Sequence, residues 1–212
     1  MKLFYTPLIG LVHKVQVVAI EAGVYDDLEK VPTIPYDQGE ELVAANPLSK
    51  VPTLLLDDGT PLFGGPVIYE YLDSLHDGPK MFPPQDSVER FISLRRLTLG
   101  DNIFDIINIR SIERDRPPGH VVTKYLTRLE NQIRRAIDRA DAEAESYSGF
   151  TIGQISIACG LHYHDWQRGK GSGLEDWRTG RTRLVKWFDR FTSRPSFVPR
   201  DEEAKAFASR SS

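Results

Sequence analysis

The stretch that decides the fold runs from residue 46 to residue 63 and reads Asn46-Pro47-Leu48-Ser49-Lys50-Val51-Pro52-Thr53-Leu54-Leu55-Leu56-Asp57-Asp58-Gly59-Thr60-Pro61-Leu62-Phe63. Asn46-Pro47 is a turn signal, and an apolar run follows at residues 53–56. The turn Asp57-Asp58-Gly59 separates this run from a second one at residues 61–63. Two short apolar runs joined by a glycine-containing turn predict a β-hairpin.

The residues before the hairpin predict a βαβ unit. Residues 2–6 form an aromatic-rich strand candidate, and residues 11–23 carry apolar side chains at helical spacing that end at Gly23. Residues 28–33 predict a second strand, which should run parallel to the first with a right-handed crossover. A short helix is expected within residues 37–46.

The residues after the hairpin predict a helix and then a second domain. Pro66 can be the first residue of a helix that ends near Leu75, which completes an α/β domain over residues 1–76 in the order βαβ then ββα. Residues 77–86 have the glycine and proline content of a linker.

The rest of the chain is helical in pattern. An all-helical domain is expected over residues 87–198, followed by a polar tail at 199–212. Thr151 and Gln154 have the spacing of a capping box. One long charged helix should place the following residues on a single apolar face: Val122, Leu126, Leu129, Ile133, Ala136 and Ala140.

Composition is that of an ordinary globular protein. An apolar content of 40% with a net charge of −3 does not fit a protein that coats nucleic acid. The single cysteine, Cys159, cannot form an internal disulfide, and no apolar run is long enough to span a membrane. The N-terminal residues lack the pattern of a signal peptide. We therefore expect a cytoplasmic protein without nucleic-acid or membrane partners.

The segment from Asn46 to Thr53 resembles the N-P-x-G-x-V-P signature of the glutathione transferase superfamily. The residues 67–72, the Thr151 capping box and the segments 187–191 and 194–197 resemble the same family, so the similarity covers nearly the whole chain. It implies a thioredoxin-like domain that binds glutathione, followed by an all-helical bundle. It also implies a homodimer and an apolar electrophile as second substrate.

The resemblance implies a role for each matching residue of the loop. Val51-Pro52 matches a cis-prolyl dipeptide whose backbone pairs with the cysteinyl part of glutathione as an added strand. Lys50 matches a position that meets the glycyl carboxylate in some classes. The alternatives are a tight turn without a ligand and a solvated surface lysine.

The chain departs from the family at the residue that activates the thiol. Glutathione needs a donor to stabilise its thiolate, and the usual serine or cysteine is replaced by Ile9, which has no donor. Tyr5, Thr6 and His13 are the nearby alternatives. Tyr5 can equally be a core aromatic residue, and Thr6 a loop cap.

A second departure lies at Gly64-Gly65, where the family carries an acidic residue and a serine that bind the ammonium and carboxylate of the γ-glutamyl group. Loss of one or two such bonds weakens binding about tenfold to several hundredfold. The glycines admit close backbone approach to an anion, or they only cap a helix.

In the helical domain, Tyr163 and Trp166 are candidates for the electrophile pocket, with a core role as the alternative. His162 and His164 are two residues apart on a helix and do not face each other, so no metal site is expected. The favoured interpretation is a glutathione transferase of low or specialised activity. The alternative is a non-catalytic homologue that serves as a binding or regulatory scaffold.

Overall fold

The computed structural model describes residues 1–6, 13–37 and 39–198, which form two compact units. The first unit consists of Met1–Phe82 together with residues 195–198, and the second consists of Pro83–Arg194. Each unit has its own set of buried residues, and each is described by itself below.

The first unit is built on a four-stranded sheet with the order β2-β1-β3-β4. β1 is parallel to β2 and antiparallel to β3, and β3 pairs antiparallel with β4, so both the βαβ unit and the hairpin are confirmed. The strands are β1 (Lys2–Tyr5), β2 (Glu29–Pro32), β3 (Thr53–Leu55) and β4 (Pro61–Phe63).

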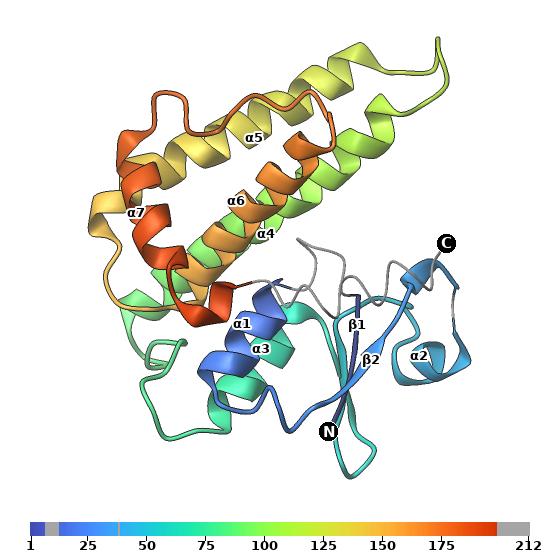
Figure 1. Ribbon diagram of the computed structural model, residues 1–212, viewed down its shortest axis with the longest axis vertical. Coiled ribbons are helices and arrows are strands. Elements are labelled where there is room, and N and C mark those ends of the chain that lie inside the picture. Colours follow the sequence, from blue (N-terminus) through green and yellow to red (C-terminus); the bar gives the residue numbers. More distant parts are fainter. Residues whose placement is uncertain (7–12, 38, 199–212) are drawn as a thin grey trace. The chain divides into compact units, whose positions relative to one another are not determined.

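Helices cover both faces of this sheet. α1 (His13–Glu21) and α3 (Gly65–Ser74) pack against each other on one side, while α2 (Glu40–Ala45) lies on the other (Figure 1). Phe4 of β1 is buried against Leu42 of α2. A short 3-10 turn, η1 (Pro35–Asp37), precedes α2. α3 begins at Gly65, one residue before the proline that the sequence favours as its start.

A buried carboxylate, that of Asp73, holds the C-terminal end of the first unit's Met1–Phe82 segment in place. Asp73 of α3 is 3% exposed and accepts hydrogen bonds from the backbone N–H groups of Met81 and Phe82, both at 2.9 Å. Both side chains are themselves buried. The segment 77–86, expected as a linker from its glycine and proline content, is therefore fixed to the first unit over part of its length.

Residues 195–198 return to the first unit, although the sequence analysis assigns them to the helical domain 87–198. The 3-10 turn η3 (Pro195–Phe197) packs against α1. Within it, the Ser196 hydroxyl donates to the Glu21 carboxylate at 2.5 Å, and the Phe197 side chain is buried. The expected polar tail 199–212 lies outside the described residues.

The second unit is helical throughout its described residues. α4, α5 and α6 run alongside one another (Figure 1), and α4 and α6 make the most extensive contact. The elements are α4 (Val88–Arg114), α5 (Thr123–Glu143), η2 (Ala144–Ser146), α6 (Ile152–Gly169) and α7 (Thr182–Thr192).

Two details of the helical unit test the sequence analysis. The capping box of α6 is present, with the Thr151 N–H donating to Gln154 Oε1 at 2.9 Å. The apolar face expected for α5 is confirmed at Leu129, Ile133 and Ala140. Val122 was wrongly placed on that face: it lies before the first turn and is 53% exposed, because the helix begins only at the next residue.

Candidate functional site

The loop before β3 is organised by a buried asparagine. Asn46 is 1% exposed, and its side-chain amide donates to the Lys50 carbonyl at 3.0 Å and to the Thr53 hydroxyl at 2.9 Å. Its side-chain oxygen accepts from the N–H of Leu48 at 3.0 Å. One side chain thus fixes both ends of the loop. The sequence shows Asn46 as a turn signal but carries no signal for this structural role.

The dipeptide Val51-Pro52 has the cis peptide bond that the resemblance implies. The ladder between β1 and β3 ends at the pair Phe4 and Thr53, so the backbone of the dipeptide lies just beyond the last pair. The Val51 side chain packs against the cluster around Phe4. An extended peptide could continue the sheet at this point, because strand addition needs an unoccupied backbone edge. Lys50 beside it is exposed to solvent.

The structure brings Thr6 towards the same dipeptide. Thr6 directly follows β1 and Val51-Pro52 directly precedes β3, so both lie beyond the Phe4–Thr53 pair at the same end of this antiparallel ladder. Thr6 is 2% exposed, and its hydroxyl oxygen has no hydrogen-bond partner among the described residues. A buried hydroxyl without a partner is uncommon and calls for an explanation such as a ligand.

The other candidates for activating the thiol have less structural support than Thr6. Tyr5 closes β1, is 3% exposed, and accepts the N–H of Thr33 on its carbonyl at 2.6 Å. Its ring therefore belongs to the core of the first unit. His13 is the first residue of α1. Ile9, at the position of the usual serine or cysteine, lies outside the described residues.

The two glycines before α3 have separate structural reasons. Gly64 has φ 87° and ψ 117°, a conformation that side chains other than glycine rarely adopt. Gly65 lies directly under the ring of Tyr69, one helical turn further along. A Cβ on Gly65 would be 2.6 Å from the Tyr69 hydroxyl oxygen and 2.8 Å from Cζ. The departure from the family at Gly65 is therefore linked to the tyrosine at 69.

The start of α3 presents few backbone donors. Pro66 has no N–H, and the N–H groups of Val67 and Ile68 donate to the Gly64 carbonyl at 3.1 and 3.2 Å. Among the described residues these bonds do not use the N–H of Gly65, which can therefore donate to an anion. Lys14 of α1 adds positive charge, because its ammonium nitrogen lies 5.6 Å from the centre of the Tyr69 ring.

Tyr163 and Trp166 lie together on α6 in the helical unit, with ring centres 5.5 Å apart. Tyr163 is 2% exposed, donates to Asn108 Oδ1 at 3.0 Å and accepts from the Gln167 amide at 2.7 Å. Trp166 is half-buried, with the Lys170 ammonium 3.7 Å from the centre of its ring. Tyr163 is thus held in place by hydrogen bonds, while Trp166 supplies the more accessible aromatic surface.

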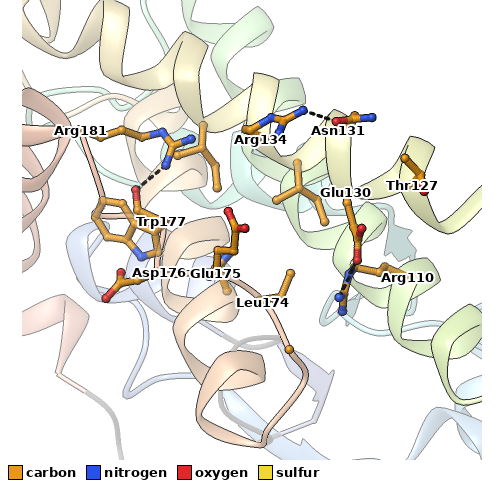
Figure 2. Close-up of a pocket in the computed structure, with 14 residues that line it drawn as sticks. Arg110, Thr127, Glu130, Asn131, Arg134, Leu174, Glu175, Asp176, Trp177 and Arg181 are labelled. Atoms are coloured by element: carbon orange, nitrogen blue, oxygen red, sulfur yellow. Dashed lines mark hydrogen bonds and ion pairs between the residues drawn. The ribbon is translucent and has the colours of Figure 1, made fainter.

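A cavity of about 470 Å³ opens within the helical unit, between α4, α5, α6 and the segment after α6 (Figure 2). Neither Tyr163 nor Trp166 lines it. At one end Arg110 donates to Glu130 at 2.8 Å (Figure 2). Arg110 also donates to the Ser172 carbonyl at 2.9 Å. At the other end Arg181 donates to the Trp177 carbonyl at 2.9 Å. The arginines are thus engaged within the protein.

His164 also lines this cavity, and it is uncharged at neutral pH. It is 2% exposed, and its Nδ1 has no hydrogen-bond partner among the described residues. Burial lowers the pKa of His164 to about 4, outweighing the attraction of Asp165 and Asp176 for a proton. The imidazole is therefore neutral and cannot anchor an anion by charge.

Across residues 1–6, 13–37 and 39–198, no group of three or more His, Cys, Asp or Glu side chains could hold a metal ion. In the same part of the chain, no helix combines the length and apolar character needed to cross a membrane.

Comparison with known proteins agrees with the fold and the loop. The family model of the glutathione S-transferase N-terminal domain matches residues 11–75. The GST-like protein YibF of Escherichia coli (strain K12), described as uncharacterized, is 29% identical over 97% of this chain and 100% of its own length.

Solved structures extend the similarity to both units. A glutathione transferase family member from Pseudomonas fluorescens Pf-5, with bound glutathione, is 31% identical with a TM-score of 0.81, over 92% of this chain and 96% of its own. A glutathione S-transferase from Methylobacillus flagellatus KT, with glutathione bound, is 27% identical with a TM-score of 0.82, over 96% of this chain and 98% of its own.

A mixed four-stranded sheet with a cis-proline before its third strand, followed by a helical unit, defines the class of two-domain proteins with a thioredoxin-like first domain. With the similarity extending over nearly the whole chain, the protein belongs to the glutathione transferase superfamily.

Proposed function

We propose that this protein is a glutathione transferase that adds the glutathione thiolate to an apolar electrophile. The observation that carries the proposal is the pairing of two features at one end of the β1–β3 ladder. The Val51-Pro52 backbone extends beyond the last pair, and Thr6, whose buried hydroxyl has no hydrogen-bond partner among the described residues, follows β1 at the same end.

Glutathione binds in this proposal as an added strand. The cysteinyl backbone of the tripeptide pairs with the backbone of Val51, and the exposed Lys50 attracts the glycyl carboxylate. The glutathione present in the structures of the Pseudomonas and Methylobacillus relatives supports glutathione as the ligand.

Thr6 supplies the hydrogen bond that stabilises the thiolate. A free thiol has a pKa of about 8.5, so only a few per cent is ionised at neutral pH. One hydrogen bond to an anion is worth roughly 1.5–3 kcal/mol, which lowers the thiol pKa by about one to two units. The thiol proton leaves to solvent. The sulfur lone pair then forms the carbon–sulfur bond, and the leaving group departs with its electron pair.

The electrophile is an apolar molecule in this proposal, and Trp166 with Tyr163 supplies aromatic surface for it in the helical unit. The active protein is a cytoplasmic homodimer, as the family resemblance implies. Glutathione is the co-substrate, and the reaction uses no metal.

One observation favours the alternative of a non-catalytic scaffold. Gly64-Gly65 lacks the acidic and hydroxyl side chains expected there, and the Tyr69 ring occupies the space next to residue 65. A protein that had lost glutathione binding would need neither side chain. The two functions differ in whether glutathione binds and whether it is consumed.

The test is calorimetric titration with glutathione, followed by turnover of a chloronitrobenzene. We expect millimolar or tighter binding and measurable turnover. Thr6→Val should bind glutathione nearly as well and lose about tenfold or more in turnover. Thr98→Val is the matched control, because the Thr98 hydroxyl only donates to the Leu94 carbonyl on an exposed face of α4.

Each arm has a result that would contradict the proposal. No heat at millimolar glutathione excludes the enzyme and supports the scaffold. Binding without turnover calls for Ile9→Ser, which restores the usual hydroxyl: a gain in turnover identifies a missing donor, and no gain contradicts conjugation at this site. Unchanged turnover in Thr6→Val removes Thr6 from the mechanism.

A further inference from the structure

Tyr69 reaches back along α3 to the place where a side chain on residue 65 would lie. Side chains on a helix lean towards its N-terminus, so residue 69 covers the turn that begins at residue 65. The Tyr69 hydroxyl oxygen lies 2.6 Å from the ideal Cβ position of Gly65. A serine hydroxyl at 65 would be one bond beyond that Cβ, so the phenol oxygen occupies the same region of space.

We propose that the Tyr69 hydroxyl binds the γ-glutamyl carboxylate of glutathione, in place of the side chain that Gly65 lacks. This inference rests on the proposed function, because it assigns one end of the same ligand. The carboxylate would accept hydrogen bonds from the Tyr69 hydroxyl and from the N–H of Gly65.

Charge and burial support this assignment. The Lys14 ammonium, 5.6 Å from the centre of the Tyr69 ring, brings positive charge to the same end of α3. Tyr69 is 6% exposed, so its ring is held in place before any ligand arrives. A donor fixed in advance binds an anion with less loss of conformational entropy than a mobile one.

The same geometry has an opposite interpretation, in which the ring fills the subsite and excludes the carboxylate. The two differ in what the hydroxyl does. A donor is lost when only the oxygen is removed, as in Tyr69→Phe, which keeps the ring. A ring that acts as a plug, by filling the subsite, stays in place in Tyr69→Phe and is removed in Tyr69→Leu.

The experiment measures, by calorimetry, the binding of three peptides to the full chain. Glutathione carries both γ-glutamyl charges, glutaryl-cysteinylglycine keeps only the carboxylate, and γ-aminobutyryl-cysteinylglycine keeps only the ammonium. We expect Tyr69→Phe to bind the first two about tenfold more weakly and the third unchanged. Tyr71→Phe, on the same helix, is the control and should match the wild type with all three peptides.

A rescue variant guards against a simple structural effect. Gly65→Ser alone crowds the Tyr69 ring and should weaken binding, whereas Gly65→Ser with Tyr69→Leu provides a serine hydroxyl with space around it. We expect the double variant to recover glutathione affinity to within about threefold of the wild type. Thermal unfolding of each variant shows whether it is folded.

The outcomes separate the inference from the proposed function. If the wild type binds glutathione and Tyr69→Phe binds all three peptides equally well, the role of Tyr69 is refuted while the function stands. Tighter binding by Tyr69→Leu establishes the plug and refutes the donor. If the wild type binds no glutathione, the function and the inference fail together.

Discussion

The amide of Asn46 donates to the hydroxyl of Thr53 at 2.9 Å, and that hydroxyl in turn donates to the Lys50 carbonyl at 2.7 Å. Both residues are fully buried. The Val51-Pro52 dipeptide therefore lies between Lys50 and Thr53, two residues that hydrogen bonds hold in place. The position of its backbone therefore depends on the buried side chains of Asn46 and Thr53.

Asn46→Ala should loosen this loop. It removes three hydrogen bonds and leaves the Thr53 hydroxyl with one partner fewer, which should lower the free energy of unfolding by about 2–3 kcal/mol. Glutathione affinity should fall with it. Asn102→Ala is the control, because that amide only donates to Thr98 on the surface of α4. Equal urea midpoints for the two variants would contradict this role of Asn46.

Gly100 of α4 lies close to the backbone of Ser156 in α6. A Cβ on Gly100 would stand 2.3 Å from the Ser156 carbonyl carbon, which belongs to backbone and cannot rotate away. Gly100→Ala should therefore cost about 3 kcal/mol or more of unfolding free energy. Gly169→Ala, with nothing within 4 Å of its Cβ position, should be neutral or stabilising by up to about 1 kcal/mol. Chemical denaturation of both variants tests the difference.

His164 should make the protein sensitive to mild acid. Its pKa is about 4 in the folded protein, against about 6.5 when unfolded, so the unfolded state binds the proton first. The stability that depends on its neutral form is complete above pH 6.5 and is lost as the pH falls towards 4. Between pH 6.5 and 4.5 the loss should be about 2–3 kcal/mol.

His164→Gln should lack this loss, because it has no proton to gain. His120→Gln, at an exposed position, should retain the wild-type dependence. Urea unfolding followed by circular dichroism at several pH values measures both. The same slope in His164→Gln as in the wild type would show that another group is responsible.

Glu143 accepts hydrogen bonds from three arginines. It accepts from Arg95 at 2.8 Å, from Arg96 at 3.0 Å, and also from Arg139. Burial raises the pKa of Glu143, but these hydrogen bonds outweigh it and hold the pKa at about 2. Because the folded pKa is the lower one, this contribution is present above pH 4.5 and disappears as the pH falls towards 2.

Glu143→Gln should lower the unfolding free energy at pH 7 by about 1–2 kcal/mol, since two of the arginines are largely solvated and their interactions are screened. The exposed Glu145→Gln serves as the comparison and should change little. High salt should shrink the gap between the variant and the wild type. A gap that does not respond to salt would argue against an electrostatic origin.

The sequence predicted the sheet well because its signals are local. The hairpin turn at Asp57-Asp58-Gly59 is set by residues adjacent in the chain and is found. The cis bond at Val51-Pro52, which is also found, was implied by the resemblance to the family. The boundary between the units was harder, since Asp73 fixes Met81 and Phe82 through contacts that composition does not reveal.

The site was predicted only in part for a similar reason. Thr6 was one of three equal donor candidates, because burial without a partner cannot be read from a sequence. The contact between Gly65 and Tyr69 could have been predicted from the sequence, because residues four apart on a helix are neighbours. The cavity beside His164 is lined by four segments that are separate in the sequence. No single stretch of sequence therefore predicts it.

The short distance between the Cβ position of Gly65 and the Tyr69 ring also limits which residues can be combined at positions 65 and 69. A serine at 65 and a tyrosine at 69 cannot both occupy this turn without displacing the ring, so the two positions depend on each other. A side chain at 65 requires the Tyr69 ring to move, and a smaller residue at 69 provides the space for it. Relatives should therefore carry one member of the pair or the other, and the two positions should covary.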